Sequence, residues 1–216
     1  MTDSLNLQLT ALTADLGVPQ EVSAVISKAL TSDGVTTVGL RVGEEAPDFD
    51  LPDATGKQVR LRELLDHGPV ALSFQRGEWC PYCNLELHTW QGLLDQVTAA
   101  GAQLVAVSPQ RPTNALSLTE KHELAFPVLS DVDQTAIRAY RLRYELSAAL
   151  KDVYANAFGV DLSMQNGDGS WTLTVPATFV VDQQRRIRFA FANTDWRVRA
   201  EPADVLAALR DAANSR

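Results

Sequence analysis

Sulfur and histidine are scarce in this chain of 216 residues, which holds two cysteines, two methionines and three histidines. Both cysteines, Cys80 and Cys83, lie in a single four-residue window. Such close spacing excludes a framework of structural disulfides, and an intracellular, cytoplasmic setting is the natural expectation. A zinc site normally needs four cysteine or histidine ligands, and the histidines form no paired motif. We therefore expect no metal and no cofactor, with zinc as a less favoured alternative.

Long apolar runs and basic clusters are also missing. No apolar stretch approaches the roughly 20 residues that cross a bilayer, and the first residues, MTDSLNLQLTALTADLG, lack the regions of a signal peptide. The chain has 19 basic and 27 acidic residues, a net charge of -8, which argues against nucleic acid or an anionic membrane as a partner. With 45% hydrophobic residues, the chain can bury the core of one globular domain.

Residues 1–38 are predicted to form a helical extension before a domain that spans residues 39–216. Apolar residues recur at helical spacing in two stripes, one on each side of Pro19. The stripes consist of Leu5, Leu9, Leu12 and Leu16, and of Val22, Val25, Ile26, Ala29 and Leu30. An apolar helix face must be buried, so we expect the extension to pack on its own domain, with a homodimer contact as the alternative.

Strands and helices alternate through much of the remaining chain. The apolar segments GPVALSFQR and AQLVAVSPQ are typical of strands inside a sheet, FPVLSD predicts another strand, and ATFVVD and RIRFAFAN predict a late antiparallel pair. A short strand pair is predicted around the turn 53–57, followed by a small helix, and longer helices at 112–124, at 202–213 and through most of 133–156. This order predicts an α/β sheet with helices on both faces.

The cysteine window, FQRGEWCPYCNLEL, lies where a predicted strand is followed by a helix. Cys80 would then stand at the helix N-terminus, with Pro81 in the first helical position, where its missing N–H costs nothing. Unpaired amides and the positive end of the helix dipole favour a thiolate there. Beyond Tyr82, Cys83 lies one turn on and within disulfide reach. We expect a redox pair that cycles between dithiol and disulfide, with a buried pair of inert thiols as the alternative.

A second informative stretch is TVPATFVVD, in which Pro176 precedes a continuous apolar strand. Proline cannot donate to a β-ladder, so this residue must begin the strand or lie in a tight turn. A cis peptide bond between Val175 and Pro176 is the geometry that we expect there.

From Val42 to Leu209 the chain resembles the peroxiredoxin superfamily, the alkyl hydroperoxide reductase and thiol-specific antioxidant group. The matching pieces are the cysteine window and the segments VGEEAPDFDLPDATGKQVRLRELL, PVALSFQRG, VAVSPQ, FPVLSDVDQTAIRAYRL and PATFVVDQQRRIRFAF. The resemblance implies a thioredoxin-like fold of the peroxiredoxin type, with a central mixed sheet flanked by helices, and it supports the cis bond at Pro176. It also implies a peroxide substrate and an external dithiol reductant of the thioredoxin or glutathione system.

The chain departs from the family pattern at two positions, one in the cysteine window and one at Pro176. Peroxiredoxins carry Thr or Ser three residues before the peroxidatic cysteine and often Glu three residues after it. The alignment that keeps Glu86 makes Cys83 peroxidatic and puts Cys80 at the Thr/Ser position. The family's catalytic arginine is replaced by Pro176, as in thioredoxins. The chain thus resembles the branch of the family that carries a Cys-x-x-Cys motif.

Arginines elsewhere could replace the missing cation. Arg76, four residues before Cys80, is one candidate, although a solvated charge at a strand end is an equal interpretation. Arg197 and Arg199 are weaker candidates because the sequence does not place their side chains. Glu86 receives no firm role, since a glutamate near a cysteine is more often solvent-facing, and one beside a thiolate would raise the pKa of the thiol.

Three functions are compatible with these residues. In a thiol-dependent peroxidase, the function that we expect, Cys83 attacks a hydroperoxide and becomes a sulfenic acid, and Cys80 condenses with it to a disulfide. In a thiol-disulfide oxidoreductase, Cys80 attacks a substrate disulfide and Cys83 resolves the mixed intermediate. The third alternative is a non-enzymatic, redox-responsive binding protein that uses the amino-terminal helices or residues 143–170. Trp79 adjoins Cys80, so its fluorescence should report the redox state.

Overall fold

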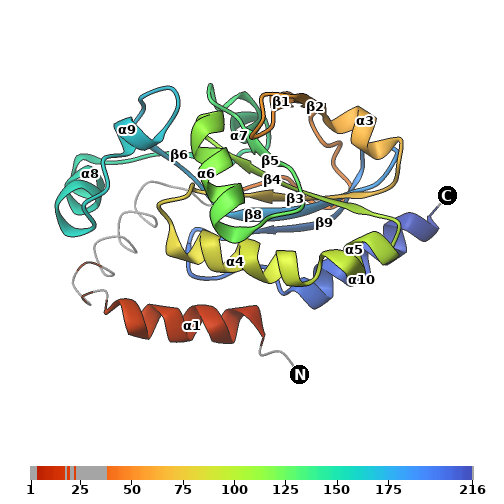
Figure 1. The fold of residues 1–216 in the computed structure, drawn as a ribbon, viewed down its shortest axis with the longest axis horizontal. Helices are drawn as coiled ribbons and strands as arrows, with labels where there is room; N and C mark the ends of the chain where they lie inside the picture. Colours follow the sequence, from red (N-terminus) through yellow and green to blue (C-terminus); the bar gives the residue numbers. More distant parts are fainter. Residues whose placement is uncertain (1–3, 18, 20–21, 23–37, 216) are drawn as a thin grey trace.

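The computed structural model describes residues 4–17, 19, 22 and 38–215. Its centre is a five-stranded mixed sheet with the strand order β5-β4-β3-β8-β9 (Figure 1). The central strand β3 runs parallel to β4 and antiparallel to β8. The strands are β3 (Val70–Phe74), β4 (Gln103–Ser108), β5 (Val128–Ser130), β8 (Ala177–Val181) and β9 (Ile187–Ala192). The predicted α/β fold with a mixed sheet is therefore confirmed.

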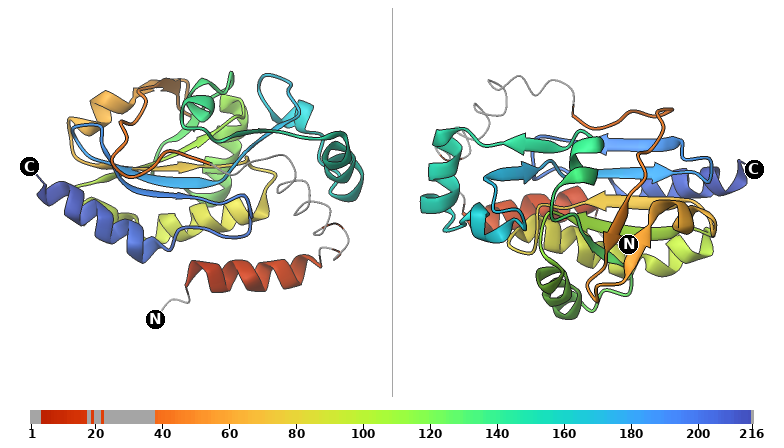
Figure 2. Two further views of the ribbon diagram at one scale, coloured as in Figure 1. Left: turned by 180° about the vertical axis from the view of Figure 1, so that it is seen from behind. Right: turned by 90° about the horizontal axis from the view of Figure 1, so that it is seen from above.

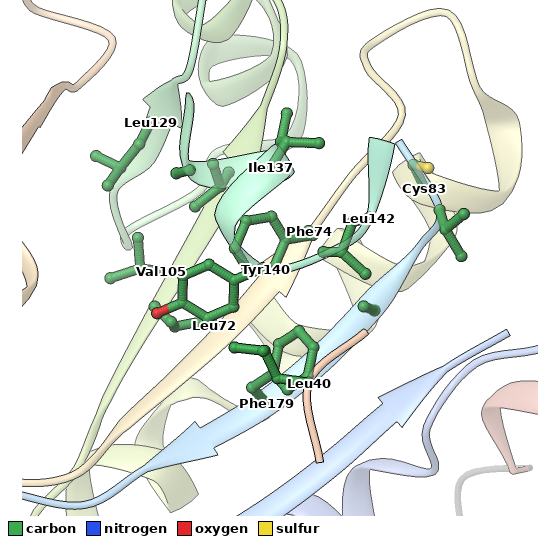
Figure 3. Close-up of a cluster of buried hydrophobic side chains, with 14 of the residues drawn as sticks. Leu40, Leu72, Phe74, Cys83, Val105, Leu129, Ile137, Tyr140, Leu142 and Phe179 are labelled. Carbon is green, nitrogen blue, oxygen red and sulfur yellow. The ribbon is translucent and has the colours of Figure 1, made fainter. Parts of the chain in front are cut away.

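Side chains alternate between the two faces of β3 and build two separate cores. Ala71 points to a cluster that contains Trp90, whereas Leu72 and Phe74 point to a second cluster that contains Tyr140. Helices α4 (Pro81–Gly92), α5 (Leu94–Ala99), α6 (Pro112–His122) and α10 (Pro202–Asn214) contribute to the first cluster, and α7 (Thr135–Ala139) to the second. Figure 3 shows Cys83 at the edge of the second cluster. The two cysteines thus belong to the edge of a hydrophobic core.

The shorter elements confirm one prediction and correct another. A hairpin around the turn 53–57 leads into a small helix, as the sequence predicts. Residues 133–156, in contrast, are interrupted by a strand, because Arg141 has a φ of +59° and ends the helical segment. The elements are β1 (Asp50–Pro52), β2 (Gln58–Arg60), α3 (Leu61–Leu65), β6 (Arg143–Glu145), α8 (Ala148–Asp152), the π-helical turn η1 (Val153–Ala157), α9 (Leu162–Gln165) and β7 (Thr172–Thr174). Strands β6 and β7 pair antiparallel, a contact between distant residues that short-range patterns do not reveal.

Helix α1 (Leu5–Leu16) lies along α4 (Figure 2). Leu5 and Leu9 are buried, and the Glu201 carboxylate accepts the backbone N–H of Leu5 and of Asn6. The first apolar stripe therefore packs on its own domain at Leu5, Leu9 and Leu12, whereas Leu16 is 44% exposed. The second stripe, apart from Val22, lies outside the described residues, and the domain boundary and the homodimer contact stay predictions.

The peptide bond between Val175 and Pro176 is trans, so the expected cis bond is wrong. Pro176 immediately precedes β8, whose first residue, Ala177, pairs with Phe74. The prediction rested on the inability of proline to donate a hydrogen bond to a β-ladder. A trans proline meets this requirement as well, because it stands just before the first ladder position of the strand.

Among the described helices, none is both long and apolar enough to cross a membrane.

Candidate active site

Strand β3 and helix α4 place the two cysteines. The chain leaves β3 through residues 75–79 and enters α4 with Cys80 as the N-cap residue and Pro81 in the first turn. Gly77 has a φ of +133°, and a Cβ there would lie 2.8 Å from the side chain of Gln110. Glycine is therefore required for the turn. The predicted position of Cys80 at a helix N-terminus is what the structure shows.

Both cysteines are free thiols and both are buried, with 1% of each side chain exposed. The Cys83 thiol hydrogen-bonds the sulfur of Cys80, so the two sulfurs are neighbours. The backbone N–H of Arg76 donates to Cys83 Sγ at 3.5 Å, and Nη1 of the same arginine lies 3.9 Å from Cys80 Sγ.

Arg76 is a buried cation and not a solvated one. Only 4% of it is exposed, and within the described part of the chain no carboxylate forms an ion pair with it. Its guanidinium lies over three aromatic rings, at 4.7 Å from Trp79, 5.4 Å from Tyr154 and 5.6 Å from Trp196, and Nη2 donates to the Tyr154 hydroxyl. A buried cation without a carboxylate strongly favours an anion beside it.

Arg199, one of the weaker sequence candidates, contacts the sulfur of Cys83. Its Nη2 lies 3.6 Å from Cys83 Sγ, and its Nε donates to Glu86 Oε2 at 2.6 Å. Both members of this ion pair are almost fully buried. Arg197, the other weak candidate, pairs instead with Asp195 at 2.8 Å in a half-exposed position.

Glu86 points into the protein and is 1% exposed, contrary to the solvent-facing interpretation. Its carboxylate also receives hydrogen bonds from Gln75 Nε2 at 3.2 Å and Ser73 Oγ at 3.3 Å. The charge of Arg199 is thus balanced by Glu86, whereas the charge of Arg76 is not balanced by a carboxylate. This difference separates the two sulfurs electrostatically.

The two thiols have opposite pKa shifts. For Cys80, burial opposes ionisation, but the hydrogen bond from Cys83 and the charges of Arg76 and Arg199 outweigh it and lower the pKa to about 6. For Cys83, burial, the hydrogen bond to Cys80 and the adjacent Cys80 charge hold the pKa well above its usual range. These opposite directions favour a thiolate on Cys80 over one on Cys83.

A pocket of about 290 Å³ reaches Cys80. Aromatic side chains dominate its lining, which also contains Arg76 and Pro81; the aromatic residues are Trp79, Tyr82, Tyr154, Phe158 and Trp196. Cys83 is not part of the lining. Pro176 lines a smaller, adjoining cavity that shares Arg76, Tyr154 and Trp196 with this pocket.

Sequence reasoning missed two members of the site, Tyr154 and Trp196. They come from segments 78 and 120 residues away from Arg76 in the chain, and neither stands in a recognisable motif. Their aromatic character alone gives no signal, since aromatic residues are common in cores.

Among the described residues, no group of three or more His, Cys, Asp or Glu side chains could hold a metal ion.

Residues 42–190, most of the chain, match the model of the AhpC/TSA family. The chain belongs to the AhpC/TSA family. This AhpC/TSA member is 31% identical over 128 residues to a putative peroxiredoxin of Mycobacterium tuberculosis, a match that covers 58% of this chain and 81% of the relative. It is also 33% identical over 104 residues to the thiol-disulfide oxidoreductase ResA of Halalkalibacterium halodurans, covering 48% of this chain and 58% of that protein.

Solved structures show the same fold. The crystal structure of the peroxidoxin BcpB from Mycobacterium tuberculosis matches with a TM-score of 0.63 at 24% identity, covering 81% of this chain and 98% of that chain. Peroxiredoxin Q of Xanthomonas campestris matches with a TM-score of 0.56 at 20% identity, covering 78% and 90%. Together with the family membership, these findings make the protein an oxidoreductase enzyme of the peroxiredoxin type, and the alternative of a non-enzymatic binding protein is not supported.

Proposed function

We propose that this protein reduces hydroperoxides through a Cys80–Cys83 dithiol/disulfide cycle in which Cys80, not Cys83, attacks first. The observation that carries the assignment is that the aromatic pocket reaches Cys80 and not Cys83. Cys80 has a pKa of about 6 and lines the aromatic pocket, whereas Cys83 has a raised pKa and lies behind it. This order reverses the one implied by the sequence alignment on Glu86.

The proposed cycle balances with one peroxide and one dithiol. The Cys80 thiolate attacks the terminal oxygen of ROOH, which forms an S–O bond, breaks the O–O bond and leaves RO⁻, released as ROH after it gains a proton. The Cys83 thiol then condenses with the Cys80 sulfenic acid, and the pair becomes a disulfide with loss of water. An external dithiol, of the thioredoxin or glutathione system, reduces the disulfide and restores both thiols.

A second candidate function is thiol-disulfide exchange, which the Cys-x-x-Cys motif and the likeness to ResA favour. In that reaction too Cys80 would attack. However, Cys80 is only 1% exposed and is reached through a pocket of about 290 Å³. Such a pocket admits a small hydroperoxide, whereas a protein disulfide would have to displace the aromatic residues that line it. This access argument places disulfide exchange second.

Single-turnover kinetics of the native protein and of the variants Cys80→Ser and Cys83→Ser test the proposal. The reduced proteins are mixed with hydrogen peroxide or cumene hydroperoxide, and tryptophan fluorescence and thiol content are followed. We expect the native protein to react with peroxide, Cys80→Ser to lose the reaction, and Cys83→Ser to complete one turnover and accumulate a sulfenic acid that dimedone traps on Cys80.

Two outcomes contradict this assignment. If Cys83→Ser loses the first turnover while Cys80→Ser retains it, Cys83 is the attacking residue, as the alignment implied. If the native protein reduces insulin-type disulfides but no peroxide, the exchange reaction takes first place.

Gel filtration of the reduced and oxidised protein tests the predicted homodimer, and fractionation of the source cells tests the predicted cytoplasmic location.

A further inference from the structure

The departing oxygen of a hydroperoxide needs a proton, and neither sulfur is well placed to give it. Cys80 attacks as a thiolate, and Cys83, behind it, keeps its proton for the later condensation. In the family pattern a Thr or Ser hydroxyl stands at the position that Cys80 occupies here. We propose that the hydroxyl of Tyr154 donates the proton to the departing oxygen. This inference rests on the proposed peroxidase function.

Tyr154 and Cys80 share one guanidinium. Arg76 donates from Nη2 to the Tyr154 hydroxyl and approaches Cys80 Sγ with Nη1 at 3.9 Å. All three residues line the same pocket. A peroxide whose terminal oxygen meets the Cys80 sulfur therefore has its second oxygen in the space between the sulfur, the cation and the phenol. That oxygen is the one that becomes RO⁻.

The phenolic hydrogen is available for donation. The Tyr154 oxygen accepts from Arg76, and elsewhere in the described residues no group accepts the hydrogen of this hydroxyl. A buried hydroxyl usually finds an acceptor, so a hydroxyl hydrogen without one, on a residue that lines the pocket, is a donor that a ligand oxygen can use. Burial raises the pKa of Tyr154, an effect that the Arg76 charge only partly offsets, and the phenol keeps its proton at neutral pH.

The backbone around Tyr154 holds the phenol in place. Tyr154 lies in η1, a π-helical turn that continues α8, and such turns are frequent at functional sites. Its carbonyl accepts the N–H of Val160 at 2.8 Å, and its ring packs edge-on against Trp79 and Phe158 at centroid distances of 5.9 and 5.4 Å. The side chain is 1% exposed. The hydroxyl is thus fixed in position before any substrate arrives.

The chemistry balances as a proton transfer. When the O–O bond breaks, the electron pair of that bond stays on RO⁻, which takes the phenolic proton of Tyr154 and leaves as ROH. The tyrosinate that remains is neutralised by Arg76, whose original counter-ion, the Cys80 thiolate, has just become an uncharged sulfenic acid. Water entering the pocket then returns a proton to Tyr154. One cation thus stabilises the thiolate before the step and the phenolate after it.

The substitution Tyr154→Phe, compared with native protein, tests this role through the leaving group. Single-turnover rates are measured by quenched-flow thiol counting with tert-butyl hydroperoxide, whose leaving alkoxide is a strong base, and with peracetic acid, whose leaving carboxylate needs no proton. We expect a loss of about 10²- to 10⁴-fold with the alkyl hydroperoxide, the usual size of general acid catalysis, and a much smaller loss with the peracid.

Alkylation by iodoacetamide provides a measurement that separates proton donation from thiolate activation, because iodide leaves without a proton. At a pH where Cys80 is fully ionised, we expect Tyr154→Phe and native protein to be alkylated at equal rates. Tyr140→Phe is the matched control: it removes another buried phenol hydroxyl, which donates to the Pro47 carbonyl at 2.9 Å, and it should leave all three rates unchanged.

Several results would overturn the inference. An equal loss with both oxidants, or a parallel loss in alkylation, would mean that Tyr154 acts on the thiolate through Arg76. Should Tyr154→Phe fail to fold, the native protein still decides: proton donation predicts that its rate depends weakly on leaving-group basicity across a series of peroxides, and a steep dependence contradicts it. If the native protein reacts with no peroxide, the proposed function itself fails. If the native protein reacts and Tyr154→Phe reacts equally fast with every peroxide, only the role of Tyr154 fails.

Discussion

The two sulfurs of the site lie three residues apart and are equally buried, yet their surroundings differ. Cys80 faces an aromatic pocket and has Arg76, a cation without a carboxylate partner. Cys83 faces the interior and has Arg199, whose charge is already paired with Glu86. Burial penalises both thiolates. For Cys80 the hydrogen bond from Cys83 and then the charge of Arg76 offset this penalty, whereas for Cys83 the hydrogen bond to Cys80 adds to it. Proximity of an arginine is therefore not sufficient to activate a cysteine.

The largest effect is expected where the buried ion pair is broken. In Glu86→Gln the side chain keeps its shape, but Arg199 loses its counter-ion inside the protein, so we expect the free energy of unfolding to fall by about 3–5 kcal/mol. The freed cation then favours a thiolate on Cys83, and alkylation should become divided between both cysteines. Urea unfolding and peptide mapping measure the two effects.

Glu78→Gln is the control for this change, because Glu78 lies just before α4 and, among the described residues, its carboxylate accepts only from Ser117, at 3.0 Å in an exposed position. It should alter the unfolding free energy by no more than about 0.5 kcal/mol. If Glu86→Gln behaves like Glu78→Gln, the Glu86–Arg199 pair does not distinguish the two sulfurs.

A smaller effect on stability, but a direct one on reactivity, is expected at Arg76. In Arg76→Met the charge next to Cys80 is lost, and the pKa of the thiol should rise by about 1–3 units, so alkylation near pH 6 should slow by roughly 5- to 500-fold. Stability should change little or even increase, because no carboxylate is left unpaired. Iodoacetamide kinetics and thermal unfolding provide the measurements.

Arg197→Met is the matched control, since this neighbouring arginine pairs with Asp195 and contacts neither sulfur. Its alkylation profile should match that of the native protein. A normal profile for Arg76→Met as well would show that Arg76 does not set the charge on Cys80.

The sequence reveals those parts of the fold and the site that depend on neighbouring residues. Apolar runs predict the strands of the main sheet, and the Cys80–Pro81 pair predicts the start of a helix, because both are local. Strands β6 and β7 escape prediction because their pairing joins distant segments. The cis bond at Pro176 is wrong because a position just before the strand already accommodates proline in the trans form.

Long-range contacts account for what sequence reasoning missed in the site. Arg199 reaches Cys83 across 116 residues and Tyr154 reaches Arg76 across 78, so no spacing rule connects them. Whether the Glu86 side chain points into the protein or to solvent depends on which face of α4 meets the sheet. The sequence favours solvent, because a charged residue on a helix is usually exposed. Only the pairing of Glu86 with Arg199 makes its burial tolerable.

The central claim, that the negative charge of the reduced pair resides on Cys80, is tested most directly by the pH dependence of alkylation. Reduced native protein is treated briefly with iodoacetamide between pH 4 and pH 10, and the modified cysteine is identified by mass spectrometry. Because the thiolate is the reacting form, the rate should rise with pH through a midpoint of about 6, with the label on Cys80. A midpoint near that of an ordinary thiol, or a label that appears first on Cys83, would contradict the account.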